Sequence, residues 1–154
     1  MPGLREPETG LLWKAPVAKI GADIEARDNQ GYTALHNAAA KGKQDTIKAL
    51  IDHGAKIETK NKTSCTPLHE ACNNNYIFAA KELIQAKADV NAKNNKGSTP
   101  LHVAATKNFS NIADELLVQN IDTSRRNRNR ETTLKVAKKK KAWDVEELLL
   151  PPVT

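Results

Sequence analysis

Three histidines recur at a spacing of 33 residues, which raises the question of whether they do chemistry. His36, His69 and His102 each end a similar run of threonine, alanine or proline, and leucine. A histidine in an apolar setting is a candidate metal ligand or general base. The spacing argues against a shared metal ion, because equivalent residues of stacked helical units lie about 8–10 Å apart. A zinc ion needs all its nitrogen ligands at about 2 Å.

The remaining reactive residues do not form a catalytic site. Cys65 and Cys72 fit neither a CxxC redox motif nor a four-ligand zinc site, and we expect both thiols to be reduced. Cys65 is a candidate nucleophile, but the nearby histidines are the repeating ones, to which the resemblance given below assigns a structural role. Glu146 and Glu147 occupy adjacent helix positions, so their side chains face different directions. The chain has no P-loop, GxSxG or HExxH motif. We therefore expect no enzymatic activity, no cofactor and no metal.

The histidines belong to a longer internal repeat. The segments "TALHNAA" (33–39), "TPLHEAC" (66–72), "TPLHVAA" (99–105) and "TTLKVAK" (132–138) align at an offset of 33 residues. Each threonine predicts a helix N-cap, and Pro67 and Pro100 suit the first helical position. Gly42, Asn75 and Asn108 follow that helix, where a left-handed residue ends it. Leucine and isoleucine pairs mark a second helix, so each unit predicts a turn and two short antiparallel helices.

A period of 33 residues with the pattern T-P-L-H-x-A resembles the ankyrin repeat, and the resemblance covers roughly residues 22–150. It implies an all-α solenoid of stacked helix-turn-helix units with β-hairpin-like fingers. In that family the histidine forms hydrogen bonds within the loops and holds adjacent repeats together. The predicted organisation is an N-terminal tail with a degraded half-repeat (1–21), four repeats (about 26–58, 59–91, 92–124 and 125–150) and a C-terminal tail (151–154).

Both ends of the array depart from the pattern. Pro16 falls inside an expected second helix, so either a half-repeat caps the N-terminal end or the chain begins within a longer array. We expect residues 1–10 to be disordered. In the fourth repeat Lys135 replaces the histidine, Arg130 replaces the glycine at the finger tip, and Lys141 stands where glycine or asparagine ended earlier helices. This repeat resembles a C-terminal cap with less well-defined helix ends.

The positive charge is concentrated in the fourth repeat. The formal net charge is +6, and residues 125–141 hold nine basic residues and one acid, which is +8 and leaves −2 elsewhere. A solvated cap explains this, and so does steering of an acidic protein partner. A third reading is binding of a polyanion (nucleic acid or anionic lipid) or a nuclear import signal. Aromatic residues that would stack on bases are absent from the stretch.

Resemblance to ankyrin repeats implies a non-enzymatic scaffold that binds another protein. We expect a monomer that takes an acidic or amphipathic partner segment on its fingers and concave face. Tyr76 and Phe109 are either half-buried platforms or aromatic anchors. The expected contact residues are Asn29, Gln30, Tyr32, Lys62, Thr63, Cys65, Asn95, Lys96, Ser98, Arg128, Asn129 and Glu131 on the fingers, and Lys41, Lys43, Asn73, Asn74, Tyr76, Thr106, Lys107, Phe109, Lys139 and Lys140 on the first helix and the following loop.

The sequence also predicts an intracellular location. No apolar run approaches the roughly 20 residues that span a bilayer, and the first residues lack the pattern of a secretory signal. We expect a cytoplasmic or nuclear protein. Asn91 resembles an asparagine that is hydroxylated in some ankyrin repeats.

Overall fold

This computed structural model describes residues 23–151 of the chain. Within this range, eight helices form four antiparallel pairs that are joined by loops. The predicted all-α solenoid is confirmed, and we number its repeats 1 to 4 by the predicted boundaries. The predicted N-terminal tail and half-repeat (1–21) lie outside the described residues, as do residues 152–154. The pairs are α2 (Ala34–Ala40) with α3 (Gln44–Asp52), α4 (Pro67–Asn73) with α5 (Ile77–Gln85), α6 (Pro100–Lys107) with α7 (Ser110–Leu117), and α8 (Thr133–Lys139) with α9 (Trp143–Leu149).

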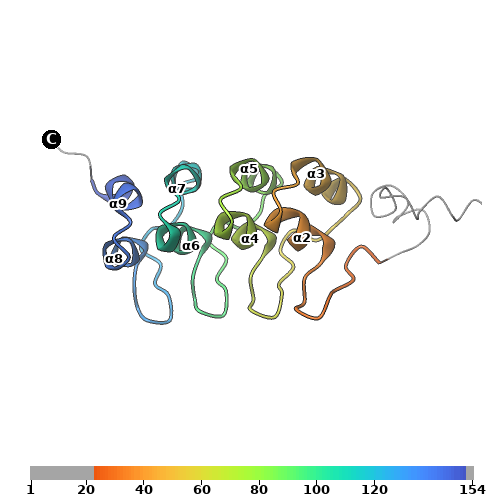
Figure 1. The fold of residues 1–154 in the computed structure, drawn as a ribbon, viewed down its shortest axis with the longest axis horizontal. Coiled ribbons are helices and arrows are strands. Elements are labelled where there is room, and N and C mark those ends of the chain that lie inside the picture. Colours follow the sequence, from red (N-terminus) through yellow and green to blue (C-terminus); the bar gives the residue numbers. More distant parts are fainter. Residues whose placement is uncertain (1–22, 152–154) are drawn as a thin grey trace, which may run out of the picture.

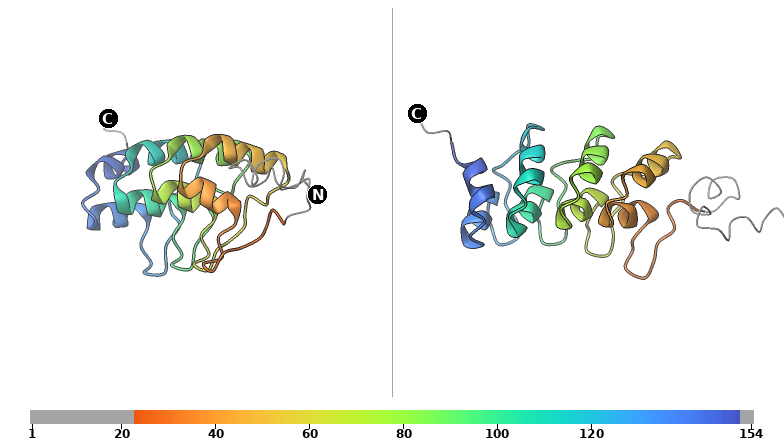
Figure 2. Two further views of the ribbon diagram at one scale, coloured as in Figure 1. Left: turned by 45° about the vertical axis from the view of Figure 1, so that its right-hand side comes forward. Right: turned by 45° about the horizontal axis from the view of Figure 1, so that its top comes forward.

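The helices form two parallel rows. Figure 1 shows α2, α4, α6 and α8 in an inner row, with α3, α5, α7 and α9 above them. Four loops project beyond the inner row on one side (Figure 2); we call them fingers 1 to 4 (27–32, 60–65, 93–98 and 126–131). No β-strand occurs between residues 23 and 151, so the fingers are built from turns. In finger 1, for example, the Asp28 N–H donates to the Tyr32 carbonyl and the Gly31 N–H donates to the Asp28 carbonyl, both at 3.0 Å.

The start of each inner helix follows from its threonine. Thr66 has an extended backbone, and its hydroxyl accepts a bond from the His69 N–H, while the imidazole accepts a bond from the Thr66 N–H. Thr33 and Thr99 form the same reciprocal cap with His36 and His102. This arrangement satisfies backbone donors that the first turn of a helix leaves unpaired.

The residue that reverses the chain after each inner helix is left-handed, with φ of 68° at Gly42, 61° at Asn75 and 57° at Asn108. Lys141 takes the same conformation, φ 56°. The expectation of less well-defined helix ends in repeat 4 was therefore wrong for the inner helix. Like α2 and α4, α8 is seven residues long, and it begins and ends at the equivalent positions of the repeat. A lysine in this conformation costs about 1 kcal/mol. The turn around it is closed by backbone bonds from the Lys141 N–H to the Lys138 carbonyl at 3.2 Å and from the Ala142 N–H to the Ala137 carbonyl at 2.8 Å.

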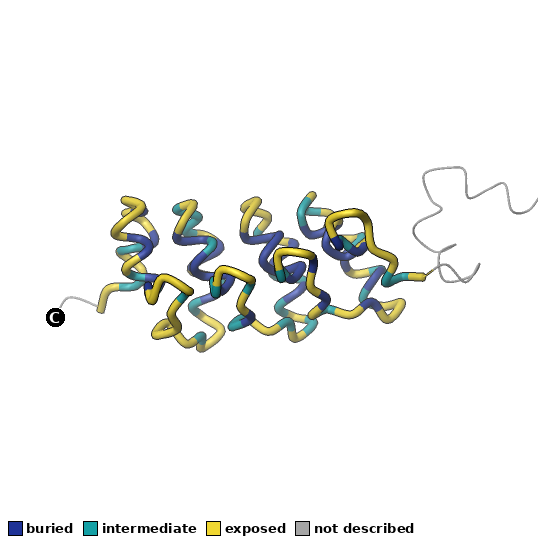
Figure 3. Tube along the Cα trace, turned by 90° about the horizontal axis from the view of Figure 1, so that it is seen from below, coloured by how far each residue is buried: buried dark blue, intermediate teal, exposed yellow. Residues whose placement is uncertain are grey.

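The core consists of small and aliphatic side chains from both rows of helices. Figure 3 shows that each helix pair contributes buried segments along the whole stack. Leu68 and Leu101 from the inner row and Leu83 and Leu116 from the outer row are almost fully buried. Burying a leucine contributes about 1.5–3 kcal/mol. Leu134, the equivalent residue in repeat 4, is only half-buried because no described residue packs beyond it. Much of the burial therefore comes from the following repeat.

Hydrogen bonds that recur from repeat to repeat join successive repeats, and sequence reasoning missed two series of them. The side chains of Arg27, Lys60 and Lys93 each donate to the carbonyl of the residue 33 positions later, at 2.6, 3.5 and 2.9 Å. Glu58 Oε2 accepts the backbone N–H of Asp89 at 2.7 Å, and Asn91 Oδ1 accepts that of Asp122 at 3.4 Å. The spacing of 33 was the available signal. These bonds hold the fingers side by side, which positions the groove described next.

Candidate partner-binding groove

The three repeating histidines are committed to the joints between repeats. In each, Nδ1 accepts the threonine N–H, and Nε2 donates to a carbonyl of the next finger: Cys65 at 2.8 Å for His36, Ser98 at 2.9 Å for His69 and Glu131 at 3.0 Å for His102. Burial lowers the pKa of all three, that of His69 to about 4. The structural role implied by the resemblance is confirmed. A neutral ring with both nitrogens occupied has no lone pair left for a metal.

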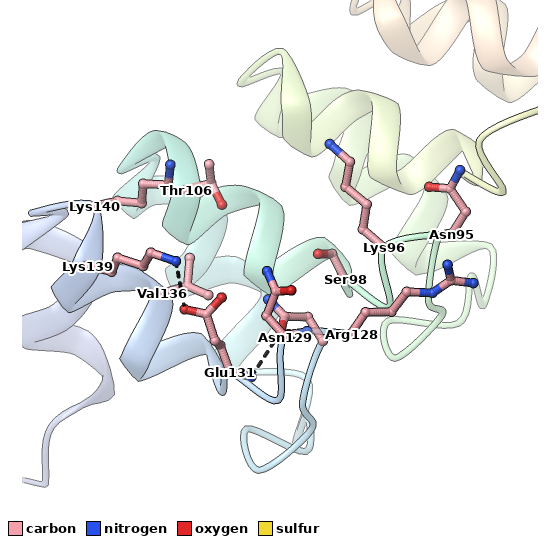
Figure 4. Close-up of a pocket in the computed structure, with 11 residues that line it drawn as sticks. Asn95, Lys96, Ser98, Thr106, Arg128, Asn129, Glu131, Val136, Lys139 and Lys140 are labelled. Atoms are coloured by element: carbon pink, nitrogen blue, oxygen red, sulfur yellow. Dashed lines mark hydrogen bonds and ion pairs between the residues drawn. The ribbon is translucent and has the colours of Figure 1, made fainter.

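A hollow of about 540 Å³ lies between fingers 3 and 4 and the inner helices α6 and α8. Figure 4 shows side chains from both fingers and both helices around it. Lys96 and Arg128 come from the finger side, while Lys139 and Lys140 come from the end of α8. The full lining is Asn95, Lys96, Ser98, Thr106, Asn127, Arg128, Asn129, Glu131, Val136, Lys139 and Lys140.

A second hollow adjoins the first on the side of repeat 2. It shares Asn95, Lys96, Ser98 and Thr106 with the first, and adds Tyr32, Thr63, Cys65, His69, Glu70, Asn73, Asn94, Val103 and Lys107. The two hollows therefore form one groove along repeats 2 to 4, between the fingers and the inner helices. We call it the groove from here on.

The groove combines basic walls with two carboxylates that already have partners inside the chain. Glu131 Oε2 pairs with Lys139 at 3.4 Å. Glu70 is buried, and its Oε1 accepts the Tyr32 hydroxyl at 3.0 Å and the Asn61 amide at 3.3 Å. Burial raises the pKa of Glu70, and burial together with this carboxylate raises the pKa of Tyr32 to about 12.

Most of the lysine and arginine side chains that line the groove have no carboxylate partner among the described residues. Among the described residues, Lys96, Lys107, Arg128 and Lys140 form no ion pair. Their positive charge is therefore available to a ligand in the groove.

Most of the sequence-predicted contact residues meet in the groove, but some do not. Lys41 and Lys43 line a separate hollow at repeat 1. Asn29, Gln30, Lys62 and Asn74 lie outside both hollows of the groove. The predicted contact residues that do line the groove are Tyr32, Thr63, Cys65, Asn73, Asn95, Lys96, Ser98, Thr106, Lys107, Arg128, Asn129, Glu131, Lys139 and Lys140.

Sequence reasoning missed three residues that share one position of the inner helix. Glu70, Val103 and Val136 lie 33 residues apart and line the groove at repeats 2, 3 and 4. Each stands three residues before a predicted contact residue, such as Asn73 or Thr106, and so lies on the same helix face. That spacing was the signal that could have found them.

The two aromatic candidates stand at the entrance to the outer helices and line neither hollow of the groove. Tyr76 precedes α5 and is 41% exposed, and its ring covers Gly42 of repeat 1. Phe109 precedes α7, is half-buried and packs against the core. Their role as anchors for a partner stays a prediction.

The basic stretch 125–141 is divided among different surfaces. Arg128, Lys139 and Lys140 line the groove. Arg125 pairs with Asp122 at 3.6 Å, and Arg126 donates to the Arg130 carbonyl at 3.1 Å. Only part of the charge counted in the sequence therefore acts on the groove.

Neither a metal centre nor a membrane-crossing helix is found in the part of the chain that the structure describes. Across residues 23–151, no three histidine, cysteine, aspartate or glutamate residues are grouped closely enough to hold a metal ion. Within the same range, every helix is too short or too polar to cross a membrane. Cys65 is half-buried, and its backbone carbonyl accepts the hydrogen bond from His36. Its Sγ atom lies 3.7 Å from the Asn94 amide nitrogen.

Comparison with known proteins agrees with this architecture. The chain is 47% identical over 36 residues to BCL-6 corepressor-like protein 1 from Homo sapiens and, to the same extent, to its counterpart from Mus musculus. That stretch is 23% of this chain, and the chain spans about 2% of the length of these relatives. A family model described as ankyrin repeats (3 copies) matches residues 13–94 and 78–152. With nearly the whole sequence matched and four stacked helix pairs in the structure, the chain belongs to the ankyrin-repeat family.

Proposed function

We propose that the groove binds an acidic, amphipathic segment of a partner protein, and that the chain acts as a scaffold with no chemistry of its own. Ankyrin repeats are general protein–protein interaction modules. A preformed groove on a rigid stack loses little conformational entropy on association, which favours binding of an extended or helical segment. We further expect this to take place in the cytoplasm or the nucleus.

The observation that carries the proposal is the charge of the groove. Lys96, Lys107, Arg128 and Lys140 come from two fingers and two inner helices, yet they line adjoining hollows. The carboxylates of Glu70 and Glu131 already have internal partners. A partner segment with several carboxylates would complement this surface and would be steered to it by the field.

The floor of the groove supports the amphipathic part of the proposal. Val103 is half-buried and Val136 is buried, and both line the hollows between the basic walls. An aliphatic side chain of the partner would cover them while its acidic neighbours reach the lysines. We therefore expect alternating acidic and aliphatic residues in the bound segment.

Binding of a defined peptide tests the proposal. Fluorescence anisotropy would be measured with a fluorescein-labelled twelve-residue peptide of alternating glutamate and leucine, and with its glutamine counterpart. We expect the acidic peptide to bind at least tenfold more tightly, and Lys96→Ser with Arg128→Ser to remove most of that preference. The control is Lys48→Ser with Lys56→Ser, which removes the same charge from exposed positions outside the groove. Equal binding by both double variants would refute the groove as the site.

A polyanion is the alternative ligand, and salt distinguishes the two. Each phosphate neutralised by a basic side chain releases counterions, so affinity for a short DNA duplex should fall steeply as salt rises. An amphipathic peptide also buries apolar surface, and its affinity should fall less. Tight, salt-sensitive DNA binding without peptide binding would move the function to the basic stretch 125–141.

The aromatic anchors are tested on the same peptide. If Tyr76 and Phe109 contact the partner, Tyr76→Ala and Phe109→Ala should weaken binding without unfolding the chain. Unchanged affinity would leave both residues with a packing role only.

A further inference from the structure

The outer side of repeat 4 carries basic, acidic and apolar side chains that are complementary to the same surface on a second copy of the chain. We define the terminal face as Leu134, Lys135, Lys138, Trp143, Glu146, Glu147, Leu149 and Leu150. These residues stand at the positions where repeats 1 to 3 contact the next repeat. Leu134, Glu146 and Leu149 are half-buried, and the other five are exposed. The surface is separate from the groove, and the inference does not rest on the proposed function.

Equivalent residues show which way these side chains face. Lys135 stands where His69 reaches the Ser98 carbonyl of the next repeat. Lys138 stands where Cys72 is fully buried, yet the lysine is exposed. The inner helix α8 therefore presents a row of positive charge to the terminal face.

The outer helix α9 presents negative and apolar side chains to the same face. Glu147 stands where Lys81 reaches Glu115 of the next repeat at 3.6 Å. Trp143 stands where Gln44 reaches Glu82 of the next repeat at 3.0 Å, and it is 63% exposed. Leu150 is also exposed, and Leu134 and Leu149 are half-exposed. Apolar side chains thus lie beside Lys135 and Lys138 of α8, and beside the exposed Glu147 and the half-buried Glu146 of α9.

Glu146 places a negative charge at a position that is apolar in the earlier repeats. It replaces residues that are buried in the earlier repeats, such as Ala80 and Ala113. Its Oε2 atom is buried, and no hydrogen-bond donor reaches it from the described residues. That oxygen is enclosed by the chain's own residues, but the side chain as a whole is half-buried, so its negative charge adds to that of Glu147 at the face.

We propose that the terminal face forms a two-fold symmetric dimer in which α8 of each copy packs on α9 of the other. The two-fold axis lies in the plane of the face and runs between α8 and α9, parallel to both helices. Rotation about this axis places Lys135 and Lys138 opposite the partner's Glu146 and Glu147. The apolar residues then meet near the axis. An axis perpendicular to the helices would place like charges together and is disfavoured. This dimer departs from the monomer that the sequence suggests.

Paired charge reversals test the arrangement. One variant carries Lys135→Glu and Lys138→Glu, and the other carries Glu146→Lys and Glu147→Lys. Sedimentation velocity over a range of micromolar concentrations should show a wild-type dimer and at least tenfold weaker self-association of each variant, because each then presents like charges to itself. An equimolar mixture of the two should associate again, because every contact becomes an opposite-charge pair.

Two controls separate the interface from loss of the fold. Lys48→Glu with Lys56→Glu makes the same charge change at exposed positions away from the face and should leave the dimer intact. In a Trp13→Phe background Trp143 is the only tryptophan, so its emission should shift to the blue with concentration. Trp143→Ser, which keeps all the charges, should weaken the dimer roughly tenfold.

The result that overturns the proposal is a wild-type chain that stays monomeric throughout, or a mixture that fails to associate while both variants keep their helical circular dichroism. Sedimentation with phosphatidylserine vesicles runs alongside. A monomer that binds these vesicles through Lys135 and Lys138 would assign the face to an anionic lipid surface instead.

Discussion

Acidification should destabilise this protein through His69, and the lowered pKa of the ring gives the size of the effect. The ring is neutral in the folded chain because burial opposes its charge, and because Nδ1 accepts the Thr66 N–H at 3.1 Å. Protonation of Nδ1 would break that bond and place a cation in the joint between repeats 2 and 3. The pKa is 6.5 for an ordinary histidine and about 4 in the folded state.

The pH window follows from these two values. Above pH 6.5 the ring is neutral in both the folded and the unfolded chain, so stability is at its full value. Between pH 6.5 and about 4 only the unfolded chain binds the proton, so the free energy of unfolding falls as pH falls. The loss from His69 alone amounts to about 2 kcal/mol at pH 5. Burial also lowers the pKa of His36 and His102, which adds to the loss.

A difference measurement isolates His69 from the other titrating groups. Burial raises the pKa of Glu58 and Glu70, which stabilises the fold as pH falls through their folded values and opposes the histidines. The assay is urea unfolding by circular dichroism at pH 7 and pH 5 for the wild type and His69→Gln, whose amide can still donate to the Ser98 carbonyl. The variant should be less stable at pH 7, and the gap should narrow by about 2 kcal/mol at pH 5.

The control is His53→Gln, because His53 is exposed at the end of α3. It should follow the wild type at both pH values. Wild type and His69→Gln curves that stay parallel between pH 7 and pH 5 would refute the role given to burial of the ring.

Three further predictions concern packing and the joints between repeats. Gly42→Ala should cost about 1–3 kcal/mol in urea unfolding, because the new Cβ would lie 2.5 Å from the Tyr76 ring at a φ of 68°. Gly54→Ala meets no atom within 4 Å and should cost only the backbone term, about 1 kcal/mol; equal losses would exclude the contact with Tyr76. Arg27→Met removes bonds to the Lys60 carbonyl and to Thr59 across the first joint, and should cost about 1 kcal/mol in thermal unfolding, with Arg27→Lys recovering part of it. Tyr32→Phe should raise the pKa of Glu70 further, because it removes a hydroxyl donor to the carboxylate; a carboxyl NMR titration that shows no rise would contradict this.

The repeat itself could be predicted from the sequence because its determinants are local. Thr66 and Pro67 start a helix through bonds and dihedral angles within one turn, and Asn75 ends it by adopting a left-handed conformation. These signals return every 33 residues, so each confirms the others. The role of the histidines came from the resemblance to ankyrin repeats, which the repeating pattern made visible, and His69 bonds both to its own cap and to the next finger.

The groove and the terminal face could not be predicted in the same way, because they depend on which neighbour each residue meets. Nine basic residues form one stretch of sequence, yet only some of them line the groove, and Glu70, which the sequence did not single out, lies in it. Lys138 occupies a position that is buried in every earlier repeat, and it is exposed only because no described repeat follows. Capping and helical periodicity depend on residues that are close together in the chain, so they can be recognised from the sequence. Burial, ion pairing and the choice of exposed face are decided by contacts between repeats, which exist only once the stack has formed.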